Sequence, residues 1–436
     1  MERIKIGGSP QQALNLYFTK QQLAVPMHPS LLSIHDFSYS LPESRIAAYP
    51  LPERDASRLL IYKRGSITED IYRNVADHLP PDARLVFNNT RVLAARIHFK
   101  KPSGGTIEVF CLEPSDDQKD PASAMVKQFS TTWKCLIGGA SKWKHGMVLE
   151  KEIHTSGASI MLEASIVERL PDSFLVEFKW NPGQFSFAEI LRETGLVPLP
   201  PYIKRAADEM DKVRYQTIYA DEYGSVAAPT AGLHFTPAVF EALKEKNIAA
   251  DFLTLHVGAG TFKPVKSPTM EGHDMHTEFM EVELDLVERI ASDDRSIFCV
   301  GSTSLRSLES LYWTGVKIIH NPMIDSAQIT IGQWEVYDGI DPENISVQQA
   351  FRALAEWMKK FGMSELISRT SILIAPGYKM RVARGLITNF HQPQSTLLLL
   401  VAACIGEDWR KVYDYALANG FRFLSYGDGC LLDFER

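Results

Sequence analysis

Residues 251–260, D-F-L-T-L-H-V-G-A-G, decide the fold: a largely apolar run of seven residues ends in two closely spaced glycines. An apolar run of this length beside glycine predicts a buried β-strand, and glycine at a strand end often marks close approach to a ligand. Upstream, Thr236 and Pro237 indicate the start of a helix over residues 237–245, because threonine caps helices and proline fits the first turn. A helix that leads into a buried strand is typical of a layered α/β domain.

This alternation of strands and helices extends in both directions along the chain. Strands are predicted at residues 59–62, 85–87, 296–301, 385–390 and 421–426, and helices at residues 187–193, 304–312, 395–405 and 409–418. The pattern predicts an α/β domain with a large mixed sheet. In such sheets, ligands bind outside the carboxyl ends of the strands.

Residues 91–182 follow another pattern. Four partly apolar runs, separated by turn residues, lie at residues 106–112, 133–137, 160–167 and 174–180. The first and last alternate between apolar and polar side chains, and a period of two predicts half-buried strands. Several short strands without a convincing helix predict a small β-barrel or sandwich, which we expect to be an inserted domain, and we take the barrel as the first interpretation.

The predicted organisation therefore has three parts. An N-terminal extension covers residues 1–36, the α/β domain covers residues 37–90 and 183–436, and the inserted barrel covers residues 91–182. An extra insertion near residues 333–370 contains a helical stripe, which we interpret as packing surface. Its members are Ala350, Phe351, Leu354, Trp357, Met358 and Phe361.

Composition places the chain among folded, cytoplasmic proteins. Of its 436 residues, 45% are hydrophobic and 23% charged, as in ordinary globular proteins. The apolar run at residues 397–405 is shorter than the roughly 20 residues of a membrane helix, and the N-terminal M-E-R-I-K-I lacks a secretory signal. Five widely spaced cysteines without C-x-x-C predict neither a disulfide framework nor a zinc knuckle.

The formal net charge of −7 argues mildly against a protein coated in nucleic acid, although it leaves room for a local basic face. Arg91 and Arg96 form part of one basic cluster, and Lys204 and Arg205 form another. We expect these four side chains to contact RNA phosphates; a solvated surface is the alternative for each cluster.

Small and polar residues occupy the stretch at residues 227–234, A-A-P-T-A-G-L-H. Small side chains let a ligand approach the backbone closely. Thr230 offers a hydroxyl group, and His234 can act as an acid or base near neutral pH. A tight structural turn with a hydrogen-bonded histidine is an equally good interpretation of this segment alone.

His256 lies near the end of the apolar strand predicted at residues 251–257, and Gly258 and Gly260 follow it. A lone histidine on a strand is more often a satisfied core residue than a functional one. The two glycines favour function, because they permit close approach of a ligand to the backbone.

Ser302 and Thr303 lie at a strand-to-helix turn. The free N–H groups and positive dipole of a helix start suit a carboxylate or phosphate, and Arg306 adds a bidentate grip. Capping by Ser304 explains the same pattern without a ligand.

Asn389 and His391 stand at the end of a further apolar strand. His273, His276 and Glu278 form H-x-x-H-x-E, which resembles a metal half-site without a matching cluster elsewhere, so we expect no metal. An acid–base or cation-contacting role suits Glu278 better. A complete G-x-G-x-x-G, a P-loop and a G-x-S-x-G are all missing, which gives no support to a nicotinamide enzyme, an NTPase or an α/β-hydrolase.

Together, these segments resemble the S-adenosylmethionine:tRNA ribosyltransferase-isomerases of queuosine biosynthesis. The matching stretches run in order from residue 41 to residue 428: L-P-E-S-R-I-A-A-Y-P (41–50), V-F-N-N-T-R-V-L-A-A-R (86–96), P-L-P-P-Y-I-K-R (198–205), Y-Q-T-I-Y (215–219), G-S-V-A-A-P-T-A-G-L-H-F (224–235), L-T-L-H-V-G-A-G-T-F (253–262), H-D-M-H-T-E (273–278), V-G-S-T-S-L-R-S-L-E-S (300–310), A-P-G-Y (375–378), L-I-T-N-F-H (386–391) and F-L-S-Y-G-D (423–428).

The resemblance implies a reaction in which the ribosyl part of S-adenosylmethionine moves to a 7-aminomethyl-7-deazaguanine base of tRNA and isomerises to epoxyqueuosine. Adenine and methionine are released. S-adenosylmethionine is then a co-substrate and tRNA the partner, with no metal and no membrane; the oligomeric state stays open. The family fold implied is an α/β domain with a mixed sheet and an inserted β-barrel.

Placed on these motifs, the chemistry assigns roles to the candidate residues. The catalytic set is His234, His256, Glu278 and His391. The substrate-binding set is Thr230, Gly258, Gly260, Ser302, Thr303, Arg306, Asn389 and Gln394. The RNA-binding set is Arg91, Arg96, Lys204 and Arg205.

Two departures from the family pattern keep alternatives open. Gln394 stands where the family has glutamate after T-N-F-H, and Cys430 stands where it has methionine. Glutamine neither accepts a proton nor balances a cation. A paralogue that uses S-adenosylmethionine on another acceptor, or a catalytically silent RNA-binding protein, would also fit these changes.

Overall fold

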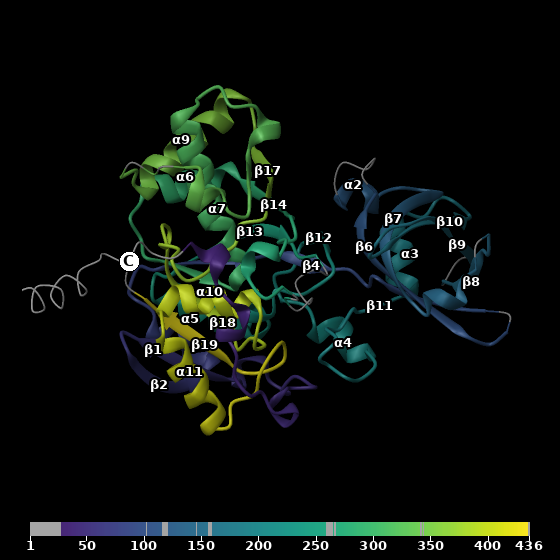
Figure 1. Cartoon of the computed structure of the whole chain (residues 1–436), viewed down its shortest axis with the longest axis horizontal. Coiled ribbons are helices and arrows are strands. Elements are labelled where there is room, and N and C mark those ends of the chain that lie inside the picture. Colours follow the sequence, from purple (N-terminus) through teal and green to yellow (C-terminus); the bar gives the residue numbers. More distant parts are fainter. Residues whose placement is uncertain are drawn as a thin grey trace, which may run out of the picture.

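The computed structural model describes residues 28–101, 103–115, 121–144, 146–155, 159–258, 265, 267–340, 342 and 344–434. Gly260 and residues 1–27 of the expected N-terminal extension lie outside the described residues. The chain forms a larger lobe and a smaller lobe, which lies to the right in Figure 1. Among the residues described, none of the helices combines the length and apolar character needed to cross a membrane.

The larger lobe contains β1 (Arg58–Lys63), β2 (Ser66–Ile71), η5 (Tyr72–His78), β3 (Arg84–Asn88), β4 (Thr90–Val92), α4 (Glu209–Arg214), β12 (Glu222–Ser225), η7 (Thr230–His234), α5 (Pro237–Glu245), β13 (Ala249–His256), β14 (Glu278–Glu283), α6 (Leu284–Ser292), β15 (Ile297–Val300), α7 (Ser302–His320), β16 (Thr330–Ile331), α8 (Glu335–Asp338), α9 (Val347–Lys360), β17 (Glu365–Thr370), β18 (Ala383–Asn389), α10 (Thr396–Ile405), α11 (Asp408–Ala418) and β19 (Gly429–Asp433).

The expected large mixed sheet is confirmed. Ten strands pair in the order β16-β17-β14-β13-β3-β15-β18-β19-β1-β2. The four neighbouring strands β13, β3, β15 and β18 are parallel, whereas β14 and β19 run antiparallel to their inner neighbours. The carboxyl ends of the four parallel strands therefore meet at one edge of the sheet, where a ligand site is expected.

Helices cover both faces of this sheet, because its central strands are apolar on both sides. In β3, Val86 faces the core formed with α6, α7, α9, α10 and α11, while Leu85 and Phe87 face the core formed with α5 and η5. Helix α7 packs closely on α9: a Cβ atom added at Gly315 would lie 2.2 Å from the carbonyl oxygen of Ala350. The sheet edge is thus held between two rigid layers.

The smaller lobe contains β5 (Arg96–Lys100), β6 (Thr106–Pro114), α2 (Pro121–Met125), β7 (Ser130–Gly138), β8 (Leu149–His154), β9 (Ser159–Arg169), β10 (Phe174–Asn181), α3 (Phe187–Thr194) and β11 (Gly195–Leu196).

Seven strands of the smaller lobe form an antiparallel sheet in the order β11-β5-β6-β7-β10-β9-β8. Within the described residues, β11 and β8 are the edge strands of this curled sheet, and the barrel expected from the sequence is not confirmed. It encloses its own core, in which Trp133 and Phe178 are buried with Phe187 of α3. Helix α3 and strand β11 lie beyond residue 182, yet both pack with this lobe.

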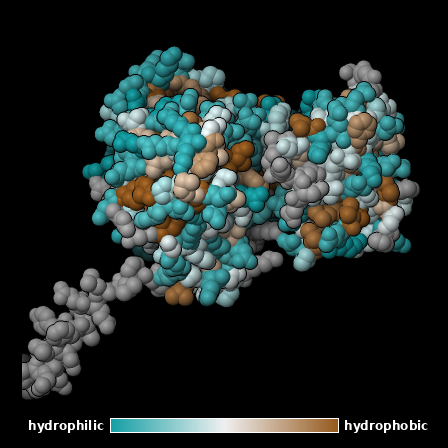
Figure 2. Space-filling view, turned by 90° about the horizontal axis from the view of Figure 1, so that it is seen from above, coloured by the Kyte–Doolittle hydropathy of each residue, from teal (hydrophilic) through white to brown (hydrophobic). Residues whose placement is uncertain are grey.

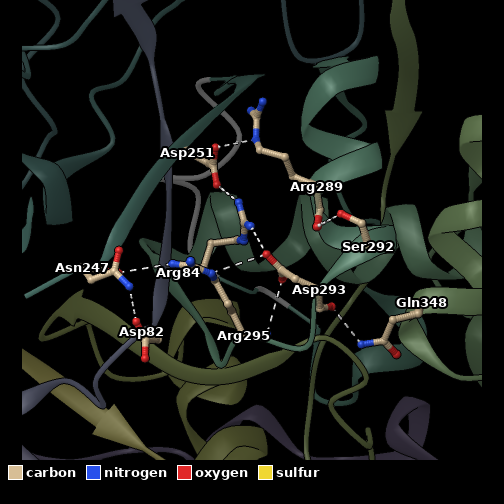
Figure 3. Close-up of polar contacts among 9 residues, drawn as sticks. All are labelled: Asp82, Arg84, Asn247, Asp251, Arg289, Ser292, Asp293, Arg295 and Gln348. Atoms are coloured by element: carbon tan, nitrogen blue, oxygen red, sulfur yellow. Dashed lines mark hydrogen bonds and ion pairs between the residues drawn. The ribbon is translucent and has the colours of Figure 1, made fainter.

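A charged network closes the opposite edge of the large sheet (Figure 3). Arg84, the first residue of β3, is 3% exposed and donates to Asp251 of β13 and, at 2.6 Å, to Asp293. Arg289 of α6 lies 3.0 Å from the second oxygen of Asp251. Because each buried charge has an opposite charge beside it, the network fixes the amino ends of these strands.

Several sequence expectations need correction. Residues 421–426 were expected to form a strand, but Phe423 makes a single bridge with Ile46 and the strand of this region is β19, nearer the C-terminus. The reason is local backbone geometry: Leu424 has a φ of 69°, which is incompatible with an extended strand. In the predicted stripe of α9, Phe361 is 46% exposed and follows the helix end, so it does not share the buried face of the others.

Few apolar side chains gather on the surface in view (Figure 2), as expected for a protein whose hydrophobic core is covered. Figure 2 shows the two lobes side by side, with apolar side chains in small separate groups among hydrophilic ones on the face in view. Single exposed apolar side chains are normal on folded proteins.

Candidate active site

A cavity of about 90 Å³, called here the loop cavity, lies at the carboxyl ends of the parallel strands. Residues from four candidate segments of the sequence, 227–234, 254–260, 302–306 and 388–391, reach it. Its lining residues are Tyr202, Ala227, Ala228, Pro229, Thr230, Ala231, Val257, Gly301, Ser302, Thr303, Thr388, Asn389, Phe390, His391, Gln392, Ser395, Leu397, Leu424 and Ser425. None of these lining residues is aspartate, glutamate, lysine or arginine.

Helix α7 opens directly onto the loop cavity. It begins at Ser302, two residues before the expected start, and Gly301 has a φ of 92°, a conformation that favours glycine. Among the described residues no side chain caps this helix start, and Ser304 instead donates to the carbonyl oxygen of Val300 at 3.0 Å. Thr303 Oγ1 is buried without a hydrogen-bond partner among the described residues. The helix start thus presents free donors to the cavity.

A chain of neutral hydrogen bonds links three candidate residues. Thr230 Oγ1 donates to Asn389 Oδ1 at 2.8 Å, and Asn389 Nδ2 lies 3.3 Å from His234 Nε2. Since the amide nitrogen is a donor, His234 Nε2 accepts and the imidazole is neutral. Burial lowers the pKa of His234 to about 3, which agrees with that state. His234 stacks on Tyr72 with ring centroids 4.2 Å apart and lies behind Asn389, outside the cavity lining.

His391 is the histidine that reaches the loop cavity. Its Nε2 lies 3.0 Å from Thr388 Oγ1, and its backbone is fixed from both sides: the N–H donates to Tyr413 at 3.0 Å, and the carbonyl oxygen accepts from Tyr39. Burial lowers the pKa of His391 to about 4, so the imidazole is neutral at physiological pH. A neutral imidazole can accept a proton or a hydrogen bond.

His256 occupies a different place. Its Nδ1 lies 2.9 Å from Thr90 Oγ1, and its Nε2 lies 3.4 Å from Glu281 Oε1. The ring packs so tightly on Gly224 that a Cβ atom there would be 2.6 Å away from it. His256 is 5% exposed and does not line the loop cavity. The structure therefore holds His256 as a buried, packed residue outside the lining of the loop cavity.

Glu278 and Arg306 form a buried ion pair with each other. They line a second cavity, called here the inter-lobe cavity, together with His273 and His276. Gly258 lies beside it, and a Cβ atom at Gly258 would be 2.4 Å from His276 Nε2. The glycine thus accommodates a histidine ring. Within the described part of the chain, no group of three or more metal-ligating side chains is gathered in one place.

Gln394 is not brought together with the other candidates. It has a φ of 55°, and its side-chain amide lies 3.4 Å from Ser38 Oγ, whereas Gln392 and Ser395 on either side line the loop cavity. The left-handed backbone at Gln394 turns the chain before α10 begins. The replacement of the family's glutamate by Gln394 therefore changes no side chain that lines the loop cavity.

Several residues of the cavity wall were not among the candidates from the sequence, and Tyr202, Leu424 and Ser425 are three of them. Tyr202 and Ser425 share a hydrogen bond of 2.7 Å, and Leu424 adopts its left-handed backbone next to them. Strained backbone of this kind often occurs at functional sites. These residues belong to two stretches that match the family, P-L-P-P-Y-I-K-R and F-L-S-Y-G-D. The family match could have indicated them, whereas neither stretch has the periodicity of a strand or a helix.

The four expected RNA-binding residues differ in how strongly their charges are engaged. Arg205 donates both terminal nitrogens to the buried Asp211, at 2.7 and 2.8 Å. Lys204 pairs with a glutamate at 2.9 Å, but both partners are largely exposed. Arg91 and Arg96 each lie over an aromatic ring. Arg205 is therefore fixed within the protein, while Lys204 can exchange its partner at little cost.

Comparison with known proteins identifies the family. The crystal structure of S-adenosylmethionine tRNA ribosyltransferase from Thermotoga maritima aligns with a TM-score of 0.42 at 25% identity, over 91% of this chain and 99% of that one. The S-adenosylmethionine:tRNA ribosyltransferase-isomerase of Pelobacter propionicus is 35% identical over 407 residues, 92% of this chain and 99% of that protein. The protein of the same name from Halothermothrix orenii is 36% identical over 410 residues, 92% of this chain and 100% of that protein. The family described as queuosine biosynthesis protein matches residues 34–432, and this chain belongs to it.

Proposed function

We propose that this chain is an S-adenosylmethionine:tRNA ribosyltransferase-isomerase. It transfers the ribosyl moiety of S-adenosylmethionine to the 7-aminomethyl-7-deazaguanine base of tRNA, isomerises it to epoxyqueuosine, and releases adenine and methionine. Two relatives of that name align over nearly their whole length. The observation that carries the proposal is the meeting of the four candidate segments around the loop cavity.

The chemistry of the loop cavity suits the adenosine part of the donor. Its lining is small, apolar or neutral and polar, as is appropriate for an uncharged base and sugar. Adenine must leave when its bond to the sugar breaks, and negative charge then develops on the base. The uncapped start of α7 and the hydroxyl of Thr303 are donors that stabilise such charge.

Within this proposal, the histidines act in their neutral forms. A base is needed to take the acidified C5′ proton beside the sulfonium, and the acceptor amine must be deprotonated before it attacks. His391 lines the cavity and is neutral because it is buried. We propose His391 as the first candidate for proton transfer, with His234 acting through Asn389 as a positioning residue. Thr230 and Asn389 supply hydrogen bonds to the donor.

The tRNA is proposed to approach from the side of the smaller lobe. Arg91, Arg96 and Lys204 lie in or near the connections between the lobes, and contacts to phosphates would release counterions. We also propose that the smaller lobe is an inserted domain, which includes α3 and β11 in addition to residues 91–182. An enzyme acting on tRNA at this step would work in the cytoplasm.

The test is release of adenine. Purified protein is incubated with S-adenosylmethionine and tRNA that carries the precursor base, and free adenine is measured by chromatography. The matched control is the same tRNA with guanine at that position. Adenine released only with the precursor-bearing tRNA is the expected result. Tight tRNA binding without adenine would point to a silent RNA-binding protein, and adenine released with a different acceptor would point to a paralogue.

A further inference from the structure

The inter-lobe cavity has a volume of about 460 Å³ and adjoins the loop cavity, since Leu397 lines both. Glu113, Lys134 and Asp172 of the smaller lobe form one side of it. The other side comes from the larger lobe: residues 273–278, Arg306, residues 372–374, Thr396 and Leu400. A ligand that extends from one cavity into the other would therefore touch both lobes.

The two cavities differ in charge. No charged residue is among those lining the loop cavity, whereas Glu113, Lys134, Asp172, Asp274, Glu278 and Arg306 line the inter-lobe cavity. S-adenosylmethionine has the same division, because its base and ribose are uncharged and its methionyl end carries a carboxylate and an ammonium group. Electrostatic complementarity favours a ligand placed with each part in the cavity of matching character.

Arg306 is the central residue of the charged cavity. It is 8% exposed, donates through Nε to the carbonyl oxygen of Ile372 at 3.2 Å, and pairs through Nη1 with Glu278, which is 3% exposed. Its Nη2 is buried without a hydrogen-bond partner among the described residues. An unpaired donor on a buried cation is costly, and a carboxylate is the group that a guanidinium fork binds best.

Helix α7 links the two cavities in a single motif. Ser302 lines the loop cavity and Arg306, four residues later on the same helical face, lines the inter-lobe cavity. Four residues correspond to about 6 Å along a helix axis. One donor molecule with its adenosine at the helix start can therefore reach Arg306 with its amino-acid end.

We propose that the inter-lobe cavity is the binding site for the zwitterionic methionyl end of the donor, and for the released methionine. Arg306 binds the carboxylate, and Glu278 faces the ammonium group. The proposal rests on the proposed function for the identity of the donor. It adds that the smaller lobe completes the donor site.

The test compares two ligands in the absence of tRNA. S-adenosylmethionine and 5′-methylthioadenosine share the adenosine part, but only the first has the amino-acid end. In calorimetric titrations we expect wild type to bind S-adenosylmethionine at least 10-fold more tightly. Arg306→Lys keeps the charge and loses the fork, so it should weaken S-adenosylmethionine binding by about 10- to 100-fold and leave 5′-methylthioadenosine unchanged.

The matched control is Arg381→Lys, because Arg381 is a half-buried arginine over the ring of Trp313, 5.3 Å away, and lines neither cavity. It should change neither affinity. If Arg306→Lys fails to fold, wild type answers the same question: L-methionine should bind at least 10-fold more tightly than L-methioninamide, which lacks the carboxylate, or 4-(methylthio)butanoate, which lacks the amine.

Equal affinities of wild type for the two adenosine ligands would overturn the inference. So would an Arg306→Lys variant that binds S-adenosylmethionine as tightly as wild type does. Because these titrations contain no tRNA, they are independent of turnover. Selective binding without adenine release would contradict the proposed function and leave this inference standing.

Discussion

Replacing Asn389 by aspartate puts a carboxylate oxygen in place of the amide nitrogen in the row of hydrogen bonds from Thr230 to His234. In the native protein the amide nitrogen of Asn389 donates to His234 Nε2, and the pKa of His234 is lowered to about 3 because the ring is buried. Compared with the ordinary value of 6.5, this corresponds to about 5 kcal/mol against protonation, at 1.36 kcal/mol per pH unit.

The new carboxylate would offset that cost. It would stand at the position now 3.3 Å from His234 Nε2, and two opposite unit charges at this distance attract by about 5 kcal/mol at an effective dielectric constant of about 20. We therefore expect the pKa of His234 to return to near 6.5 in Asn389→Asp. Below that pH the variant carries an imidazolium behind the loop cavity, which the native protein does not.

The assay is a histidine titration by NMR between pH 4 and 8. In wild type, His234 should show no titration in this range, and in Asn389→Asp it should titrate with a midpoint between pH 6 and 7. Asn389→Ala is the control, since it removes the donor without adding charge and should leave His234 neutral. If His234 of Asn389→Asp stays neutral down to pH 5, or if it already titrates near pH 6.5 in wild type, the neutral network deduced from the structure is wrong.

Three further predictions concern stability and rate. His234 and His391 stay neutral in the folded protein, whereas in the unfolded chain they take up protons below about pH 6.5. The free energy of unfolding, measured in urea, should therefore fall by up to about 2 kcal/mol per histidine between pH 6.5 and 5. In His391→Gln the part of this fall that comes from His391 should be absent. Arg84→Met should cost about 3–5 kcal/mol in the same assay because it removes the buried partner that Asp251 and Asp293 share, against less than about 1 kcal/mol for the half-buried Arg295→Met. Gln394→Glu should change adenine release by less than about twofold, because its side chain lies outside the loop cavity; a tenfold gain would show that it reaches the donor.

The convergence of the candidate segments followed from the sequence because strand polarity is a property of the whole sheet. Residues 227–231, Val257, residues 301–303 and residues 388–391 all end up in the loop cavity. Each segment follows an apolar run or lies in a loop of small residues, and parallel strands place their carboxyl ends at one edge. Apolar runs, the small residues that follow them and the polarity of parallel strands were enough for this level of prediction.

Which of the candidate side chains lie together could not be predicted from the sequence and is known only from the fold. His234, His256 and His391 look equivalent in the sequence, since each follows or ends an apolar segment. In the fold, one lines the cavity, one supports Asn389 from behind, and one is packed on Gly224. The difference comes from which neighbouring strand covers each ring, and no local pattern encodes that neighbour.

The partner of Arg306 could not be predicted from the sequence either, because no local pattern encodes which strand covers its side chain. In the sequence, G-S-T-S-L-R is one motif, and a single anion site at a helix start is the natural interpretation. The fold buries Arg306 against Glu278, which belongs to a strand and comes from a segment that the sequence suggested as a metal half-site. One helical turn thereby separates neutral donors at Ser302 from a charged pair at Arg306. A molecule that is uncharged at one end and zwitterionic at the other gains from both places only in one orientation, so in the binding mode that we propose α7 both anchors the donor and sets its direction.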